Sequence, residues 1–237
     1  MPADGERTAS TLINRQVWVF DLDNTLYPAE CDLFAEIDQR MTDFVARFLR
    51  LPREEARATQ KRYYAEHGTT LNGLMSMHGM EPDEFLDHVH EIDLTPLPRT
   101  PDLAEAIRAL PGRKFVYTNG SRGHARRVTD YMGLGDVFDG QFAIEDSHFK
   151  PKPNLSSYEA FNRLFGIAPD EAVFFEDLAR NLAPAHGMGY ATVLVQSDKD
   201  WSHEPAAARP AGIGDDLPPH IDYVTRDLTE FLRSINA

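Results

Sequence analysis

Four short runs of large apolar residues constrain the fold of this chain most strongly. They lack the apolar and polar alternation of a half-exposed strand, which is typical of parallel strands buried on both faces. The runs are residues 17–20, 114–118, 172–175 and 191–195, with a weaker fifth candidate at 140–145. Helical patterns cover residues 102–110, 122–133, 156–166 and 225–235, and Gly133 and Gly166 suit helix C-caps. This alternation predicts an α/β fold with a doubly wound, Rossmann-like parallel sheet.

Residues 31–95 interrupt the alternation, because they contain at least three helical patterns and no candidate strand. Pro52 and Gly68 separate these patterns, and the run TPLP at 95–98 predicts a stiff return to the sheet. We therefore expect an α/β core of residues 1–30 and 96–237 with an inserted helical subdomain at 31–95. An apolar stripe, interpreted as packing between helices, comprises Leu33, Phe34, Ile37, Met41, Phe44, Val45, Phe48 and Leu49.

Composition excludes several classes of partner. The 237 residues carry a formal net charge of −14, which argues against binding a nucleic acid polymer or an anionic membrane. The single cysteine, Cys31, excludes an intramolecular disulfide and is interpreted as a packing residue. No apolar run has the length of a signal peptide or a membrane span, so we expect a cytoplasmic protein. Residues 201–220, which are rich in proline, predict a surface loop.

The first apolar run ends at two carboxylates, Asp21 and Asp23, whose burial without compensation would cost several kcal/mol or more. Ligands of an open parallel sheet bind beyond the carboxyl ends of its strands, so the residues that follow each strand are informative. Those that follow the other strands, or precede the helical pattern at 156–166, are Thr118, Asn119, Gly120, Lys150, Lys152, Glu176 and Asp177. We expect these groups to meet at one edge of the sheet.

Four carboxylates at one edge would repel one another unless a cation lay among them, and Mg²⁺ prefers such oxygen ligands. Asp21 can then attack phosphorus, while Asp23 can protonate the leaving alkoxide and later activate water. Thr118 and the backbone amides near Asn119 and Gly120 can bind phosphoryl oxygens. Lys152 can neutralise the phosphoryl group. The predicted partner is thus a small phosphorylated substrate.

Four motifs, in order and spacing, resemble those of the haloacid dehalogenase-like hydrolases. They are DLDNT (21–25), TNG (118–120), KPKPN (150–154) and FFEDLARN (174–181). The opening DLDNTLYP and the KPKP run are most similar to pyrimidine 5′-nucleotidase-like members. The resemblance spans nearly the whole chain and implies that residues 31–95 form a helical cap.

The resemblance also implies roles for individual residues. Asp21 would be the nucleophile and Asp23 the general acid and base, with Mg²⁺ held by the Asp21 carboxylate, the Asp23 carbonyl oxygen and an acid of the last motif. Glu176 stands where this family commonly has aspartate, which leaves Glu176 and Asp177 as alternative ligands, with Asp177 favoured. Thr118 and Lys152 would bind phosphate, and Lys150 would be an exposed neighbour.

The second acid distinguishes two reactions within the family. Halide leaves without a proton, whereas an alkoxide needs one, so Asp23 favours a phosphatase over a dehalogenase. The resemblance further implies a nucleoside monophosphate or another small phosphate ester as substrate. A phosphomutase and a non-catalytic phosphate-binding regulatory protein are the alternative functions.

Several other residues allow more than one interpretation. Arg180 and Asn181 could cap a helix or orient Asp177. His88 and His90 form an H-x-H whose rings would point to opposite sides of a helix, so we interpret both as surface residues. The polar candidates for substrate contact in the helical subdomain are Tyr63, Tyr64, Asn72 and His78.

Overall fold

The computed structural model describes residues 9–202, 204, 209–210 and 216–235. These residues form a parallel sheet in the order β3-β2-β1-β4-β5-β6. The strands are β1 (Val17–Phe20), β2 (Arg113–Tyr117), β3 (Gly140–Phe142), β4 (Ala172–Glu176), β5 (Ala191–Val195) and β6 (Tyr223–Thr225). The chain moves outward from β1 to β3, returns to β4 beside β1, and then moves outward on the other side. The point where the strand order reverses, at which open sheets bind ligands, therefore lies between β1 and β4.

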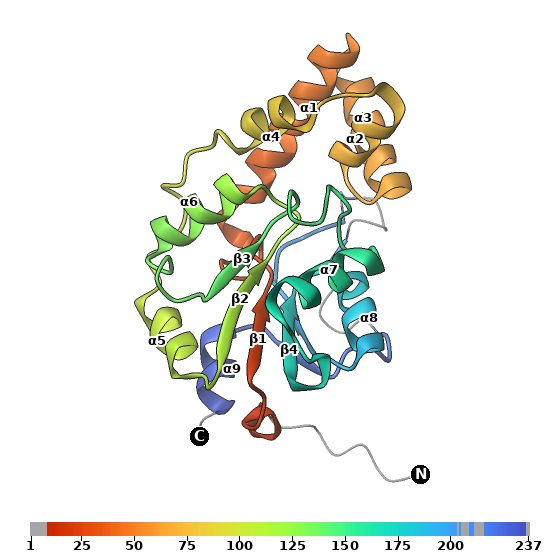
Figure 1. Cartoon of the computed structure of the whole chain (residues 1–237). Coiled ribbons are helices and arrows are strands. Elements are labelled where there is room, and N and C mark those ends of the chain that lie inside the picture. The colour runs from red at the N-terminus through yellow and green to blue at the C-terminus, as the bar shows by residue number, and fades with distance from the viewer. Residues whose placement is uncertain (1–8, 203, 205–208, 211–215, 236–237) are drawn as a thin grey trace.

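Helices cover both faces of this sheet (Figure 1). Successive side chains of a strand point to opposite faces, so Trp18 and Phe20 join one apolar cluster and Val17 and Val19 join the other. Helices α5 (Pro101–Ala109), α6 (Arg122–Met132) and α9 (Leu228–Ile235) pack on the first face. Helices α7 (Leu155–Phe165) and α8 (Ala179–Met188) pack on the second. The predicted doubly wound α/β fold is confirmed.

Some predicted boundaries differ from the structure. The weak fifth strand ends at Phe142, because turns follow from residue 143 and the Asp146 carboxylate accepts a hydrogen bond from the Ala143 amide. Strand β6 was not predicted, since its three partly exposed residues give no buried pattern. Its pairing with β5 delays the start of α9 to Leu228. The predicted C-cap glycines are confirmed: Gly133 and Gly166 have φ angles of 81° and 60°.

Residues 31–95, all of which the structure describes, contain four helices and no strand. They are α1 (Leu33–Leu49), α2 (Arg53–His67), α3 (Thr70–His78) and α4 (Pro82–His90). This helical segment lies beyond the carboxyl ends of the strands (Figure 1). Its predicted stripe is largely interior, with Phe44 and Val45 fully buried, although Phe48 is 38% exposed at the edge of the packing.

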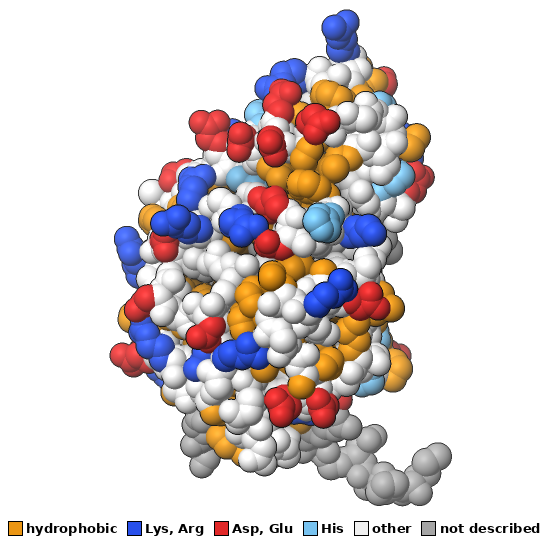
Figure 2. All heavy atoms as spheres, in the orientation of Figure 1, with side chains coloured by type: hydrophobic (Ala, Val, Ile, Leu, Met, Phe, Trp, Pro, Cys, Tyr) orange, Lys and Arg blue, Asp and Glu red, His pale blue; other side chains and the backbone are white. Residues whose placement is uncertain are grey.

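Charged side chains of both signs are interspersed on the face shown in Figure 2, where they form no continuous basic patch. No helix in the described part of the chain is both long and apolar enough to cross a membrane. The described residues of the predicted loop 201–220 have no helix or strand, and Glu204 among them is buried. Residues 203, 205–208 and 211–215 of that prediction lie outside the described residues.

Candidate active site

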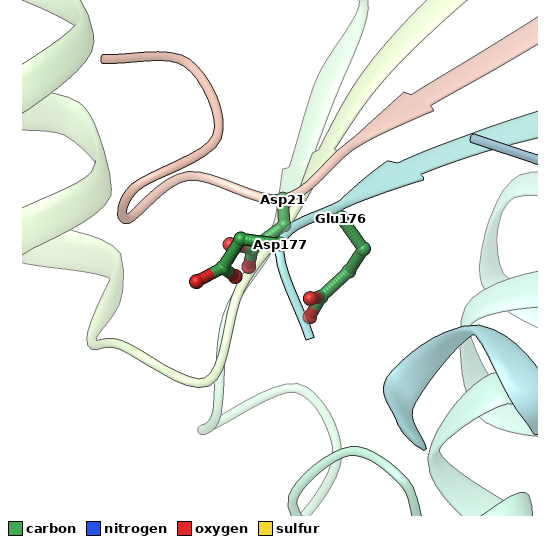
Figure 3. A group of neighbouring side chains, drawn as sticks. All are labelled: Asp21, Glu176 and Asp177. Atoms are coloured by element: carbon green, nitrogen blue, oxygen red, sulfur yellow. The ribbon is translucent and has the colours of Figure 1, made fainter. Parts of the chain in front are cut away.

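Three carboxylates meet where β1 and β4 end. The strand register pairs Phe20 with Phe175, and the Asp21 amide donates a 2.9 Å hydrogen bond to the Phe175 carbonyl oxygen. Asp21 therefore lies level with Glu176, the last residue of β4. Asp21, Glu176 and Asp177 each offer an oxygen, and these three oxygens lie within 4.8 Å of one another (Figure 3). The switch point thus carries a buried acidic cluster.

Lys152 brings a positive charge into this cluster from the loop before α7. Its Nζ lies 2.6 Å from Asp21 Oδ1 and 3.0 Å from Glu176 Oε1, and it donates a 2.9 Å hydrogen bond to the Tyr117 carbonyl oxygen. The Asn119 side chain holds the Lys152 backbone, accepting from its amide at 2.8 Å and donating to its carbonyl at 3.3 Å. Asn119 thereby positions the ammonium group through the chain. Lys150 is exposed, as predicted.

The cluster carries more negative charge than its lysine compensates. With all three carboxylates ionised, the single ammonium group would leave a net charge of −2. Burial, together with Glu176 and Asp23, raises the pKa of Asp21 to about 7, against the opposing effect of Lys152. Burial, Glu176 and Asp21 likewise raise the pKa of Asp177 well above its usual value. A divalent cation with oxygen ligands, such as Mg²⁺, fits this donor set and would relieve the repulsion.

The two acids of the last motif differ in their remaining capacity for a ligand. Glu176 accepts hydrogen bonds from Asn181 Nδ2 and from the Leu178 amide, both at 2.6 Å, in addition to contacting Lys152. Among the described residues, no N–H or ammonium group donates to the Asp177 carboxylate. In Figure 3 the carboxylates of Asp21 and Asp177 lie side by side, and the Glu176 carboxylate lies to one side of them. This geometry favours Asp177 as the cation ligand and explains Asn181, which orients Glu176 instead of Asp177.

Asp23 lies outside the cluster, in a separate environment. Its Oδ1 accepts hydrogen bonds from the Tyr27 hydroxyl at 2.6 Å and from His124 Nε2 at 2.8 Å. Burial raises the pKa of Asp23, but His124 and Tyr27 outweigh it, so the net pKa is lowered. His124 stacks on His90, with ring centroids 4.3 Å apart. The prediction that His90 is a surface residue is wrong, because α4 turns this ring inward and leaves it 8% exposed.

Thr118 and Gly120 line the cavity shared by the acidic cluster and Asp23, and Gly120 lies close to Asp23. The Gly120 amide donates a 2.9 Å hydrogen bond to Thr118 Oγ1. A Cβ at position 120 would lie 3.2 Å from His124 Cδ2 and 3.3 Å from Thr118 Oγ1, which leaves no room for a larger side chain. Asn24 has a φ of 60°, a conformation that asparagine tolerates, and it turns the chain directly after Asp23.

A cavity of about 430 Å³ opens beside these groups, and the helical segment supplies much of its wall. The sheet side contributes Asp21, Asp23, Thr118, Asn119, Gly120, Lys152, Glu176 and Asp177. The helical segment contributes, among others, Phe34, Ile37, Met41, Gln60, Tyr64, Leu71, Phe85, Val89 and His90. All predicted site residues therefore border one cavity.

The predicted substrate contacts of the helical segment are mostly wrong. Of the four candidates, Tyr64 alone is among the described residues that line the cavity. Tyr63 and His78 share a 2.7 Å hydrogen bond within the segment, and Asn72 donates to the His67 carbonyl oxygen at 2.8 Å. The side chains of these three residues form hydrogen bonds within the helical segment. Sequence spacing does not reveal those partners.

Arg180 has a role that neither interpretation anticipated. Its guanidinium carbon lies 4.5 Å from the centroid of the Tyr64 ring, and it donates a hydrogen bond to the Tyr64 hydroxyl. Arg180 thus joins α8 of the sheet layers to α2 of the helical segment.

Comparison with known proteins agrees with this geometry. "Phosphate metabolism protein 8" of Saccharomyces cerevisiae is 28% identical over 212 residues, covering 80% of this chain and 64% of that protein. "Enolase-phosphatase E1" of Drosophila persimilis is 28% identical over 54% of this chain and 48% of its own length. "(S)-2-haloacid dehalogenase" of Xanthobacter autotrophicus is 29% identical over 59% of this chain and 56% of its own length. The chain thus spans about half to two thirds of these relatives.

A solved structure shows the same fold. The "HAD phosphatase from Thermococcus onnurineus" superposes with a TM-score of 0.62 at 21% identity, covering 94% of this chain and 98% of that one. A sequence model of the haloacid dehalogenase-like hydrolases matches residues 16–189, which is more than half of the chain and includes all four motifs. The chain therefore belongs to the haloacid dehalogenase-like hydrolases.

Proposed function

We propose that this hydrolase is a Mg²⁺-dependent phosphomonoesterase that forms an aspartyl-phosphate at Asp21. The observation that carries the proposal is the pair of differently placed carboxylates that face one cavity. Asp21 lies in the acidic cluster with Lys152, whereas Asp23 lies apart from it and is held by His124 and Tyr27. Two acids in contrasting environments are suited to separate roles in one reaction.

In the proposed reaction an Asp21 oxygen attacks phosphorus, and Asp23 gives a proton to the departing alkoxide. Asp23 then takes a proton from the water that cleaves the aspartyl-phosphate. Lys152 and the Thr118 hydroxyl would hold phosphoryl oxygens. Mg²⁺, held by Asp21, Asp177 and the Asp23 carbonyl oxygen, would supply positive charge that offsets the surrounding carboxylates.

The helical segment is proposed to act as a cap. It lines the cavity together with the acids, and several polar contacts join it to the rest of the chain. Arg180 contacts Tyr64, while Lys61 Nζ lies 2.6 Å from Glu204 Oε2. A cap that closes over bound substrate would exclude water during attack on phosphorus.

For the substrate, we propose a nucleoside monophosphate or another small phosphate ester in the cytoplasm. The nucleotide rests on the resemblance of DLDNTLYP and KPKP to pyrimidine 5′-nucleotidase-like proteins. The apolar wall formed by Phe34, Met41 and Phe85 supports a leaving group with an apolar face. A screen of phosphate esters, with nucleoside monophosphates foremost, tests this part.

Dehalogenation is the second candidate, because a dehalogenase is among the similar proteins. The test is hydrolysis of an aryl phosphate with Mg²⁺ or with EDTA, beside release of halide from a 2-haloacid. We expect phosphate release that requires Mg²⁺ and is lost in Asp21→Asn. Halide release without phosphate release would overturn the proposal. Oxygen from labelled water should appear in the phosphate, whereas transfer to a bound sugar would indicate a phosphomutase.

A further inference from the structure

We infer that His124 is a positioning residue, which fixes Asp23 so that one named oxygen, Oδ2, faces the leaving group. The inference rests on the proposed function and extends it to a residue outside the four motifs. His124 is 1% exposed and lies in the first turn of α6. Its ring reaches Asp23, which is 101 residues earlier in the chain.

The two oxygens of Asp23 are treated differently by the protein. Oδ1 accepts both available donors, the Tyr27 hydroxyl and His124 Nε2. No donor from the described residues reaches Oδ2, which faces Gly120 at 3.6 Å from the position of a Cβ there. Asp23 also borders the cavity. One oxygen is thus held in place while the other stays open toward the cavity.

The backbone and the ring of His124 are both held by neighbouring residues. The Ser121 hydroxyl accepts a hydrogen bond from the His124 amide at 3.2 Å, which begins the helix. The ring lies against Gly120, and it stacks on His90 at an interplanar angle of 14°. His90 Nδ1 shares a 2.9 Å hydrogen bond with Ser121 Oγ, so α4 of the helical segment also supports this arrangement.

Two substitutions separate positioning from packing. His124→Phe keeps an aromatic ring for stacking on His90 but removes the donor to Asp23. His124→Gln loses the ring but can place an N–H near the position of Nε2. If His124 only fills space, phenylalanine should be the better replacement; if it positions Asp23, glutamine should be.

The readout is kcat/KM across phosphate esters with different leaving groups, measured with Mg²⁺ on the full chain. An alkoxide requires a proton from Asp23, whereas a nitrophenolate leaves with little help. Since general acids contribute roughly 10²–10⁴-fold, we expect His124→Phe to lower kcat/KM for an alkyl phosphate by about 30-fold or more. The loss for nitrophenyl phosphate should stay below about fivefold, and His124→Gln should recover most of the activity on the alkyl ester.

His88→Phe, in α4 and outside the residues that line the main cavity, is the control for loss of a histidine and should resemble the wild type. Equal losses for all leaving groups, or better activity of His124→Phe than of His124→Gln, would overturn the inference while the proposed function stands. A wild-type protein that hydrolyses no ester in the series would overturn the proposed function and the inference with it.

Discussion

Two sides of the candidate site treat their carboxylates in opposite ways. On the acidic side, formed by Asp21, Glu176, Asp177 and Lys152, burial and mutual repulsion raise the pKa values of Asp21 and Asp177. On the histidine side, formed by Asp23, Tyr27, His124 and His90, two hydrogen-bond donors lower the pKa of Asp23. Residues two positions apart in the sequence thus acquire different chemistry from their surroundings. The first side fits a cation, whose charge would offset the mutual repulsion, and the second holds a carboxylate apart from that cation, as proton transfer by Asp23 requires.

Asp21→Asn should abolish the catalytic function proposed for the acidic side. Removing the nucleophile should lower kcat/KM by roughly four orders of magnitude or more for every ester, whatever its leaving group. The measurement is phosphate release under excess Mg²⁺, with Asp83→Asn, an exposed residue of α4, as a matched control. Residual activity above about one per cent of the wild type would assign the nucleophile elsewhere.

Asp23→Asn should remove the proton transfer proposed for the histidine side. The resulting loss of kcat/KM should depend on the leaving group. For an alkyl phosphate we expect kcat/KM to fall by roughly 10²–10⁴-fold, because the general acid is lost. The loss should shrink as the leaving group improves, which is the contrast with Asp21→Asn. A plot of log kcat/KM against leaving-group pKa that is parallel to the wild-type plot would contradict this division of roles.

Substitutions of Glu176 and Asp177 should show which of the two contributes more to Mg²⁺ binding. Asp177→Asn removes the proposed ligand and should raise the Mg²⁺ concentration for half-maximal activity by roughly 100-fold or more. Glu176→Gln disturbs a group that contacts Lys152 and Asn181, and should raise it by roughly tenfold. Titration of activity with Mg²⁺ checks the order. A larger effect from Glu176→Gln would make Glu176 the direct ligand.

The thermal stability of the protein without substrate should reveal the repulsion within the acidic side. The pKa of Asp21 is about 7 in the folded protein and 3.8 without perturbation, so the folded state binds more protons between these values. Its contribution to stability is therefore complete below pH 4 and is lost as the pH rises toward 7. In EDTA, Asp21→Asn should be more stable than the wild type at pH 7.5, by roughly 1–4 kcal/mol, and nearly equal to it at pH 4. Melting curves at both pH values test this. Greater stability of the wild type at pH 7.5 would show that the acidic side lacks the inferred repulsion.

The sequence predicted the sheet better than the helical segment. Runs such as residues 17–20 and 172–175 are buried on both faces, so their continuous apolar character identifies them directly. Strand β6 has three residues that are partly exposed, and the signal is correspondingly weak. Tyr63 and Asn72 illustrate a second limit, because their partners are set by packing between helices.

The residues of the candidate site also divide into those that the sequence predicted and those that it did not. Asp21, Thr118 and Asp177 follow strands and Lys152 precedes helix α7, and the topology brings all four to one cavity. His124 was not predicted, since its contact with Asp23 depends on the direction of α6 and on the ring of His90. One signal was present in the sequence: His124 comes four residues after Gly120, within the first turn of the helix that follows the TNG motif. The opposing environments of the two aspartates depend on such contacts between distant elements.

Chemical trapping of the phosphorylated residue tests the central claim most directly. Enzyme mixed with excess phosphate ester and Mg²⁺ is quenched and reduced with borohydride, which converts an aspartyl-phosphate to homoserine. Mass spectrometry of the peptide containing residues 17–28 should find homoserine at position 21, only when substrate is present and never in Asp21→Asn. Sustained turnover by the wild type with no modified residue, or with the modification at Asp23, would contradict the account.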